Sequence, residues 1–366
     1  MGKRIPLFSI TLWFFTLFLS ACNAQLPVEP SATILLTNTP TPLPTEMSTP
    51  TETVTPTATS IPIYCNEVED GKLFDVVFSI PTGENGIHYE GGDVPESLRW
   101  GPAAFTISKD GVFWIADTAG DRLLSYGSDG VFLGIIDLEG LAVGVTDLVV
   151  NNDIILVLDQ SSLPPKVLRL TVRGDLLKSY DLPKGLYLED GLTGIALEDH
   201  GELLIERRFG DRVTQFLNEK GDLIEKIETT GYPHNGRLYF AYVNGLASAN
   251  PKHGCINIGS EKIEIDTTYD LGGIQILGFG ESDDFYVLIE EVVQNPAIQV
   301  FQTIRHYDIK GNLLGIASMP LDEQYTYVDH DFAFGADGCP YALATHPDHG
   351  EILRLYFHKE IPPNSP

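Results

Sequence analysis

Positive charge is scarce in this chain. Of its 366 residues, 23 are Lys or Arg and 51 are Asp or Glu, so the formal net charge at pH 7 is −28. Such an acidic surface repels nucleic acid and anionic lipid head groups, and it favours cations or cationic partners. We therefore exclude DNA and RNA binding.

Sequence signatures of catalysis and cofactor binding are also missing. The chain has no G-x-S-x-G elbow, H-E-x-x-H, C-x-x-C, P-loop or D-x-D-x-D-G calcium loop. Gly278-Phe279-Gly280 lies between two expected strands, so no helix N-terminus follows it to hold a phosphate. His346-Pro347-Asp348-His349 could offer two imidazoles to a metal, but no third ligand is evident and we interpret it as a loop. We assign no catalytic residue, metal or cofactor.

The longest apolar run stops short of a membrane span. Lys3 and Arg4 precede an uncharged run from Ile5 to Leu19, whereas a spanning helix needs about 20 apolar residues. The run ends at Ser20-Ala21-Cys22, the order of a lipoprotein cleavage site. We predict a signal peptide over residues 1–21 and a palmitate-type lipid anchor on Cys22; an ordinary secretory signal cleaved near Ala24 is the alternative.

A biased segment follows the predicted anchor. Thr, Pro and Ser dominate from Gln25 to about Pro62, a composition that buries no core and favours extended polyproline II. At about 3.1 Å per residue, a stalk over 22–65 would hold the next domain on the order of 100 Å from the bilayer. We expect an extracytoplasmic, membrane-anchored protein, with a folded domain over 66–360 and a short tail over 361–366.

An internal repeat organises the folded region. Short segments with a two-residue period, rich in Val, Ile, Leu, Phe and Tyr, are separated by turns that contain Gly and Asp. No segment has helical periodicity, so the sequence predicts an all-β fold. The hairpin turns centred on Gly130, Gly174, Gly221 and Gly311 are 44, 47 and 90 residues apart, and 90 is about twice 45. One degenerate repeat is therefore hidden, and the period is that of β-propeller blades.

We predict a six-bladed β-propeller of four-stranded antiparallel blades; five or seven blades and a β-sandwich are the alternatives. The strand Phe74–Ile80 has no blade of its own, so we expect it to complete the last blade and cover an exposed edge. The blades are placed over residues 101–139, 144–183, 191–230, 237–268, 272–319 and 328–358.

Strand order also predicts the disulfide. Cys65 lies shortly before the closing strand, and Cys339 begins the middle strand of the same blade, so both lie on one face. Cys255 belongs to blade four, too far away for the roughly 4.4–6.8 Å Cα separation of a disulfide. We predict a Cys65–Cys339 bond and a free, buried Cys255.

One blade resembles a known family. The segment from Phe113 to Leu123, followed by Asp129-Gly130, resembles the NHL-repeat propellers, whose fold serves binding modules, lactonases and lyases. In gluconolactonase-like propellers a metal-binding Glu precedes a Gly-Pro at this point, but here Trp100 precedes Gly101-Pro102. An indole supplies no oxygen ligand, which argues against a lactonase.

Two classes of function remain after these exclusions. The first is a monomeric propeller that binds a protein, peptide or glycan; the second is a hydrolase or lyase with its site at the central channel. The loops joining second to third strands, and those joining successive blades, emerge on one face, where we expect the ligand. The candidate ligand-binding residues are Trp100, Asp147, Arg207, Asn244, Tyr327, Asp329 and His330.

Overall fold

The computed structural model describes residue 65 and residues 72–92, 98–188, 191–198, 201–210, 212–243, 252–280, 284–294, 297–321 and 324–360. The chain divides into two compact units, Met1–Ala58 and Thr59–Pro366, and every described residue belongs to the second. The predicted signal, Cys22 and nearly all of the predicted stalk lie outside the described residues. Among the described residues, no helix is long and apolar enough to cross a membrane.

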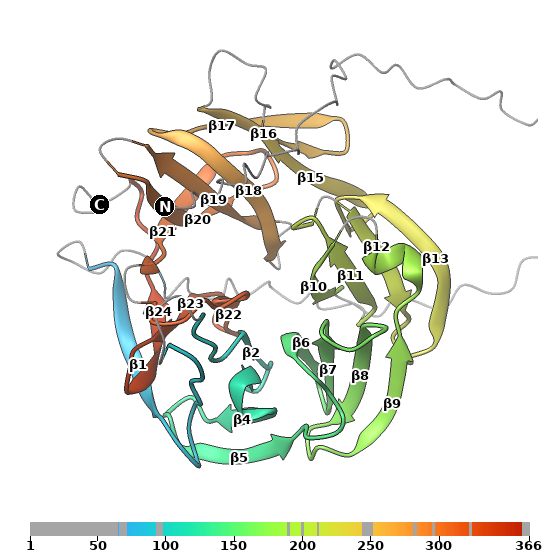
Figure 1. Cartoon of the computed structure of the whole chain (residues 1–366). Helices are drawn as coiled ribbons and strands as arrows, with labels where there is room; N and C mark the ends of the chain where they lie inside the picture. Colours follow the sequence, from blue (N-terminus) through green and yellow to red (C-terminus); the bar gives the residue numbers. More distant parts are fainter. Residues whose placement is uncertain are drawn as a thin grey trace, which may run out of the picture. The chain divides into compact units, whose positions relative to one another are not determined.

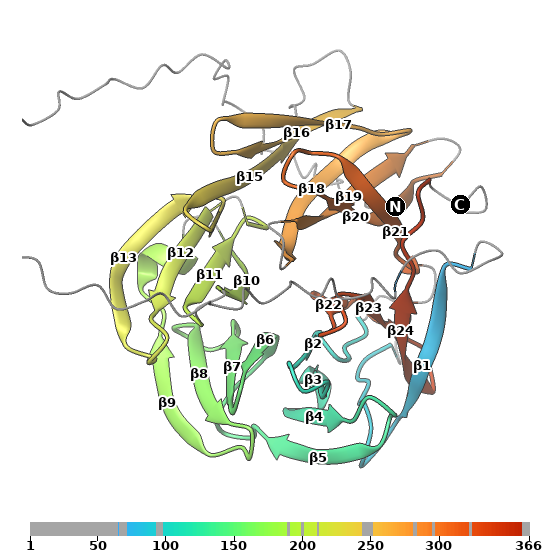
Figure 2. The same cartoon turned by 180° about the vertical axis from the view of Figure 1, so that it is seen from behind.

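The described residues of the second unit form six four-stranded sheets, and all neighbouring strands within them are antiparallel. Figure 1 and the reverse view in Figure 2 show that the sheets follow one another around a ring. The fold is therefore the predicted six-bladed β-propeller. Blades one to three comprise β2 (Ala104–Ile107), β3 (Phe113–Asp117), β4 (Arg122–Tyr126) and β5 (Phe132–Asp137); β6 (Val145–Asn151), β7 (Ile154–Asp159), β8 (Lys166–Thr171) and β9 (Leu176–Asp181); and β10 (Leu192–Leu197), β11 (Leu203–Arg207), β12 (Arg212–Leu217) and β13 (Leu223–Thr230).

The remaining blades follow the same plan with one exception. The sixth sheet has the order β1-β24-β23-β22, so β1 from the N-terminal side takes its outermost place. Two short helices, η1 (Thr118–Gly120) and α1 (Lys184–Tyr187), lie in connections. Blades four to six comprise β14 (Tyr232–His234), β15 (Arg237–Val243), β16 (His253–Ile258) and β17 (Glu261–Asp266); β18 (Asp270–Phe279), β19 (Phe285–Val293), β20 (Gln299–Tyr307) and β21 (Leu313–Ser318); and β22 (Phe332–Phe334), β23 (Pro340–Thr345), β24 (His349–Leu355) and β1 (Phe74–Pro81).

Blade two shows how burial decreases from the second strand to the rim. In blade two, the second strand β7 is buried from Ile155 to Asp159, whereas the outer strand β9 exposes most of its residues. Neighbouring sheets cover both faces of the inner strands, as when Trp114 and Leu123 of blade one pack with Leu148 of blade two. A second strand such as β7 therefore has a near-continuous apolar sequence, because both of its faces are buried.

The third-to-fourth strand turns explain the glycine spacing. Gly130, Gly174, Gly221 and Gly311 have φ of 77°, 90°, 81° and 82°. Each glycine N–H donates to the carbonyl three residues earlier, so the same left-handed turn occurs in blades one, two, three and five.

Blade four begins earlier than predicted. We expected it at residue 237, but its first strand is β14, only three residues long, starting at Tyr232. The comparable turn glycine is Gly259 with φ 57°, which lies 38 residues after Gly221 and 52 before Gly311. These unequal spacings add up to the observed 90, which is why the repeat was hidden.

The cysteines lie as the strand order predicted. Cys65 and Cys339 form a disulfide with a Cα–Cα distance of 5.4 Å. The Cys65 carbonyl also accepts a hydrogen bond from the N–H of Phe357, 2.9 Å away. Cys255 is buried and does not take part in the disulfide.

A polar residue near the end of the second strand binds the connection that enters its own blade. Asp159 accepts hydrogen bonds from Val143 N–H and Gly144 N–H at 3.0 and 3.2 Å. Glu291 accepts from Thr268 N–H and Tyr269 N–H, both at 2.9 Å. We call Asp117, Asp159, Arg207, Glu291 and Thr345 the strand-end set.

Asp117 and Thr345 act in the same way. Asp117 accepts the N–H of His88 at 2.8 Å, and Thr345 Oγ1 accepts the N–H of Tyr325 at 2.9 Å. These contacts pair polar groups that would otherwise be buried without partners, so the set is part of the scaffold.

Candidate functional site

A small pocket lies where the first strands of the blades converge. Its cavity measures about 200 Å³, and its lining residues come from β2, β6, β10, β14, β18 and β22, with Glu206 from β11. The described residues that line it include Asp147, Glu206 and His330 but no Lys or Arg. The pocket is therefore acidic, with a single imidazole.

Asp147 and His330 form the first half of this site. Asp147 is 4% exposed, and its carboxylate accepts hydrogen bonds from Leu148 N–H at 2.8 Å and Ile195 N–H at 2.7 Å. His330 Nε2 lies 3.5 Å from Asp147 Oδ2 and 2.9 Å from the carbonyl oxygen of Thr193. Because a carbonyl only accepts hydrogen bonds, His330 Nε2 carries the proton and donates it to Thr193.

Backbone pairing and a glycine hold His330 in place. The His330 N–H donates to Ala103 O at 3.0 Å, and the His330 carbonyl accepts from Phe105 N–H at 3.3 Å. A Cβ on Gly194 would lie 2.8 Å from His330 Cε1 and 2.9 Å from Asp147 Oδ2. Gly194 therefore provides the space in which the imidazole approaches β10.

Glu206 and Tyr232 form the second half. Glu206 is 6% exposed and lines the pocket together with Tyr232. Burial raises the pKa of Glu206 to about 7, and the charge of Asp147 adds to this, while Tyr232 and His330 oppose it. Glu206 is therefore poised to gain or lose a proton near neutral pH. Asp147, Glu206, Tyr232 and His330 are called the channel cluster below.

Electrostatic interactions within the channel cluster link its proton affinities. Burial raises the pKa of Asp147, although His330 and two backbone hydrogen bonds oppose the shift. Burial alone would lower the pKa of His330, but the charges of Asp147 and Glu206 outweigh it and raise that pKa. The neighbouring Asp331 is part-buried, and burial raises its pKa to about 6. The single imidazole of His330 therefore cannot neutralise the charges of all the carboxyl groups around it.

Exposed aromatic residues lie on the two chain segments that lead into Ala103 and His330. Trp100 is 59% exposed and Tyr327 is 77% exposed, each three residues from the paired Ala103 and His330. The two segments are in contact, because a Cβ on Gly101 would lie 2.8 Å from Thr326 Oγ1. The guanidinium of Arg99 also lies 4.5 Å from the centroid of the Tyr325 ring. Trp100 and Tyr327 form what we call the aromatic rim.

Two of the predicted ligand residues are placed differently. Arg207 was expected on an exposed loop, but it ends β11, is 1% exposed and pairs with Glu228 at 2.5 Å. Its Nη1 donates a hydrogen bond to Gly185 O at 3.4 Å, in the connection that enters blade three. Arg207 therefore binds that connection as a donor, whereas Asp159 binds the equivalent connection of blade two as an acceptor. Asn244, expected at the start of a first strand, follows the second strand β15 and lies outside the described residues.

Of the other predicted residues, Asp147 and His330 line the pocket, and the rest lie on the segments that precede it in sequence. Asp147 and His330 are in the channel cluster, Trp100 and Tyr327 are in the rim, and the exposed Asp329 precedes His330. The sequence reasoning did not single out Glu206, Tyr232 or Gly194. One feature of the sequence could have pointed to Glu206, the penultimate residue of β11. The penultimate residues of β3, β7 and β23 are the apolar Ala116, Leu158 and Ala344, so Glu206 is the charged exception among these four second strands.

Comparisons with known proteins return only distant likenesses. No protein-family model matches the chain, and no curated protein matches it. Virginiamycin B lyase from Staphylococcus aureus is similar at 16% identity and a TM-score of 0.39, covering 69% of this chain and 94% of that one.

Two further solved structures are similar at the same level. A Thermus thermophilus protein assigned as an oxidoreductase (glucose dehydrogenase) shares 14% identity, with a TM-score of 0.43 and coverage of 74% of this chain and 100% of that one. A Bacteroides fragilis protein assigned as exported shares 11% identity, with a TM-score of 0.42 and coverage of 80% and 98%. At these values the likenesses carry no argument about ligands or chemistry.

Proposed function

We propose that this protein is a lipid-anchored, extracytoplasmic propeller that binds a cationic side chain of a protein or peptide partner at the mouth of its channel. The observation that carries the proposal is the acidic pocket, which gathers Asp147 and Glu206 around one imidazole and is lined by no described Lys or Arg. A cation entering this pocket would stabilise carboxylates that are otherwise underpaired.

The size of the pocket favours a single side chain over a whole metabolite. Its volume of about 200 Å³ is below the roughly 300–1,000 Å³ of ordinary small-molecule sites. The aromatic rim would add contact area beside it, since exposed Trp and Tyr residues anchor protein interfaces and attract cations through their ring faces. Trp100 and Tyr327 are the rim residues in question.

Binding of capped tripeptides with a central Lys, Arg, Leu or Glu to the full-length protein in detergent tests the proposal. By calorimetry at pH 8 we expect the Lys or Arg peptide to bind best, and Glu206→Gln to weaken that binding at least about 10-fold. Affinity should also fall about 10-fold or more at pH 5.5, because Glu206 and Asp331 become protonated. Equal binding of all four peptides would overturn the proposal.

The rim and the opposite face provide matched substitutions. Trp100→Ala and Tyr327→Ala should each weaken peptide binding by about 5-fold or more, as truncated aromatic anchors usually do. Asp129→Ala and Lys220→Ala change the third-to-fourth strand turns at the other ends of the strands and should leave binding unchanged. The reverse pattern would place the functional face on the opposite side.

Membrane attachment through Cys22 is part of the same proposal. It is supported by the basic start, the apolar run and the Leu19-Ser20-Ala21-Cys22 order. We expect Cys22→Ala to abolish incorporation of a labelled fatty acid and to release the protein from membranes or block its processing. Equal labelling of both proteins would contradict the anchor.

Acid–base catalysis is the second candidate function, and the presence of Glu206 and His330 in one pocket favours it. A carboxyl with a pKa of about 7 can accept or donate a proton at neutral pH, as a hydrolase or lyase requires. A panel of chromogenic lactones and esters would test it, with Glu206→Gln and His330→Ala expected to abolish turnover. Turnover unaffected by either change would exclude this pocket as the reaction site.

A further inference from the structure

A second group of titratable side chains lies at the turn between β23 and β24, separate from the channel cluster. Register pairs Thr345 with Gly350 and Ala344 with Glu351, and the N–H of His346 donates to the His349 carbonyl at 2.8 Å. His346 thus stands opposite His349. Residues two apart on a strand share a face, so Glu351 lies beside His349 and diagonal to His346.

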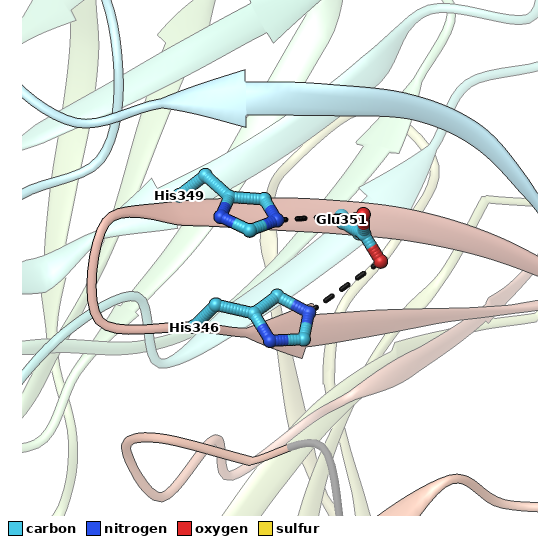
Figure 3. Close-up of side chains that lie close together, drawn as sticks. All are labelled: His346, His349 and Glu351. Atoms are coloured by element: carbon cyan, nitrogen blue, oxygen red, sulfur yellow. Dashed lines mark ion pairs between the residues drawn. The ribbon is translucent and has the colours of Figure 1, made fainter.

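Both imidazoles direct Nε2 toward the carboxylate of Glu351, and their rings stack with centroids 4.5 Å apart. Glu351 Oε2 lies 3.4 Å from His346 Nε2, and Glu351 Oε1 lies 3.4 Å from His349 Nε2. One potential metal-binding atom from each residue lies within 4.8 Å of the corresponding atoms of the other two. Figure 3 shows both imidazoles directing Nε2 at the Glu351 carboxylate from neighbouring strands.

These spacings suit a metal ion better than direct hydrogen bonds. An N–H···O hydrogen bond is usually about 2.7–3.2 Å long, so both 3.4 Å separations are too long for good ones. Two ligands of a tetrahedral zinc ion lie about 3.4 Å apart, which is the separation that each imidazole Nε2 has from one of the two Glu351 oxygens. The side chains are 21%, 33% and 22% exposed, so the group is sheltered but open to solvent.

Surrounding contacts orient the group. Asp348 Oδ1 lies 2.7 Å from His349 Nδ1, which directs Nε2 away from Asp348 and toward Glu351. A carboxylate on the far nitrogen of a metal-binding imidazole is the common second layer of zinc sites. The Tyr89 hydroxyl donates to the His349 carbonyl at 3.1 Å, which ties the turn to the loop after β1.

We propose that His346, His349 and Glu351 form a binding site for a divalent late first-row metal ion, with Zn²⁺ the expected occupant. Two imidazoles and one carboxylate match zinc, whereas Ca²⁺ and Mg²⁺ prefer sites made of oxygen ligands. Three protein ligands leave one tetrahedral position for water or for a group of a partner. The sequence offered only the two histidines, because Glu351 joins them through strand register.

The test is metal binding by the full-length protein in detergent after treatment with a chelator. Equilibrium dialysis against buffered Zn²⁺ should give one ion per chain, and the visible spectrum of Co²⁺-loaded protein should show a tetrahedral ion. We expect His349→Ala and the isosteric Glu351→Gln each to lower Zn²⁺ affinity by at least about 10-fold. Mg²⁺ should not compete.

His253→Ala is the control, because His253 is an exposed histidine that also pairs with a carboxylate, Asp266, but in blade four. It should bind Zn²⁺ like the wild type. Circular dichroism and metal-free thermal unfolding establish that each variant is folded, and added Zn²⁺ should raise the melting temperature of the wild type and of His253→Ala only. Wild-type affinity in folded Glu351→Gln and His349→Ala would overturn the proposal, as would binding of less than half an ion per wild-type chain.

Discussion

The strand-end set and the channel cluster both bury charged groups, but they satisfy them differently. Glu291 in the strand-end set has its own cation, Arg305 Nη2 at 3.1 Å, besides two backbone donors. In the channel cluster, Asp147 and Glu206 depend on the one imidazole of His330. The first arrangement binds connections to blades. The second leaves carboxyl groups that can still bind a proton or a cation.

This difference separates scaffold from candidate site more clearly than burial does. Arg207 and Glu206 are adjacent in β11 and are both nearly inaccessible. Because successive side chains of a strand point to opposite faces, Arg207 reaches Glu228 and Gly185, whereas Glu206 lines the channel pocket. Neighbours in sequence therefore have unrelated roles.

Breaking a strand-end ion pair should have the largest effect on stability. Arg305→Met would leave Glu291 buried without its cation, and we expect the free energy of unfolding in urea to fall by about 3–5 kcal/mol. The double variant Glu291→Gln with Arg305→Met should recover part of that loss, since no unpaired charge remains. A loss below about 1 kcal/mol in the single variant would mean that the pair is not part of the scaffold.

Removing a channel carboxylate should raise the free energy of unfolding at pH 8, the opposite of the effect at the strand-end ion pair. The pKa of Glu206 is about 7 in the folded state and near 4.5 when unfolded, so the folded state binds the extra proton between these values. Stability from this group is complete below about pH 4.5 and is lost as pH rises through 7. Glu206→Gln should therefore match the wild type at pH 4.5 and be more stable at pH 8, by on the order of 3 kcal/mol. A variant less stable than wild type at pH 8 would place Glu206 with the scaffold.

A neutral strand-end residue should show a smaller effect. Thr345→Val removes the Oγ1 that accepts the N–H groups of Tyr325 and Thr326 at 2.9 and 3.0 Å. We expect a loss of about 1–3 kcal/mol in the free energy of unfolding, and recovery in Thr345→Ser. If Thr345→Val and wild type unfold together, hydrogen bonds to the connection do not stabilise blade six.

The aromatic rim should matter least for folding. Trp100 and Tyr327 are mostly exposed, so Trp100→Ala and Tyr327→Ala should change the free energy of unfolding by less than about 0.5 kcal/mol. Urea unfolding of the same preparations used for peptide binding would check this. A large destabilisation would mean that the rim is a packing element and not a recognition surface.

Much of the architecture was predictable because its causes are local. Alternation in β17 and the apolar run in β7 follow from how many faces each strand buries, and the glycines of the hairpin turns follow from their positive φ. The candidate site was predictable only in part. Asp147 and His330 were found because they start inner strands, but nothing local distinguishes the exposed loop expected at Arg207 from the buried strand end that it occupies.

The sequence by itself determined the repeat, its turns and the number of blades, since strand period and turn conformation depend on neighbouring residues. Only the tertiary structure decided which polar groups meet. Asp147, Glu206 and His330 come from three different blades, and His346 reaches Glu351 only through the pairing of β23 with β24. Burial and mutual charge, which shift proton affinity in the channel, arise from that convergence, because they depend on distances in space that no local pattern encodes.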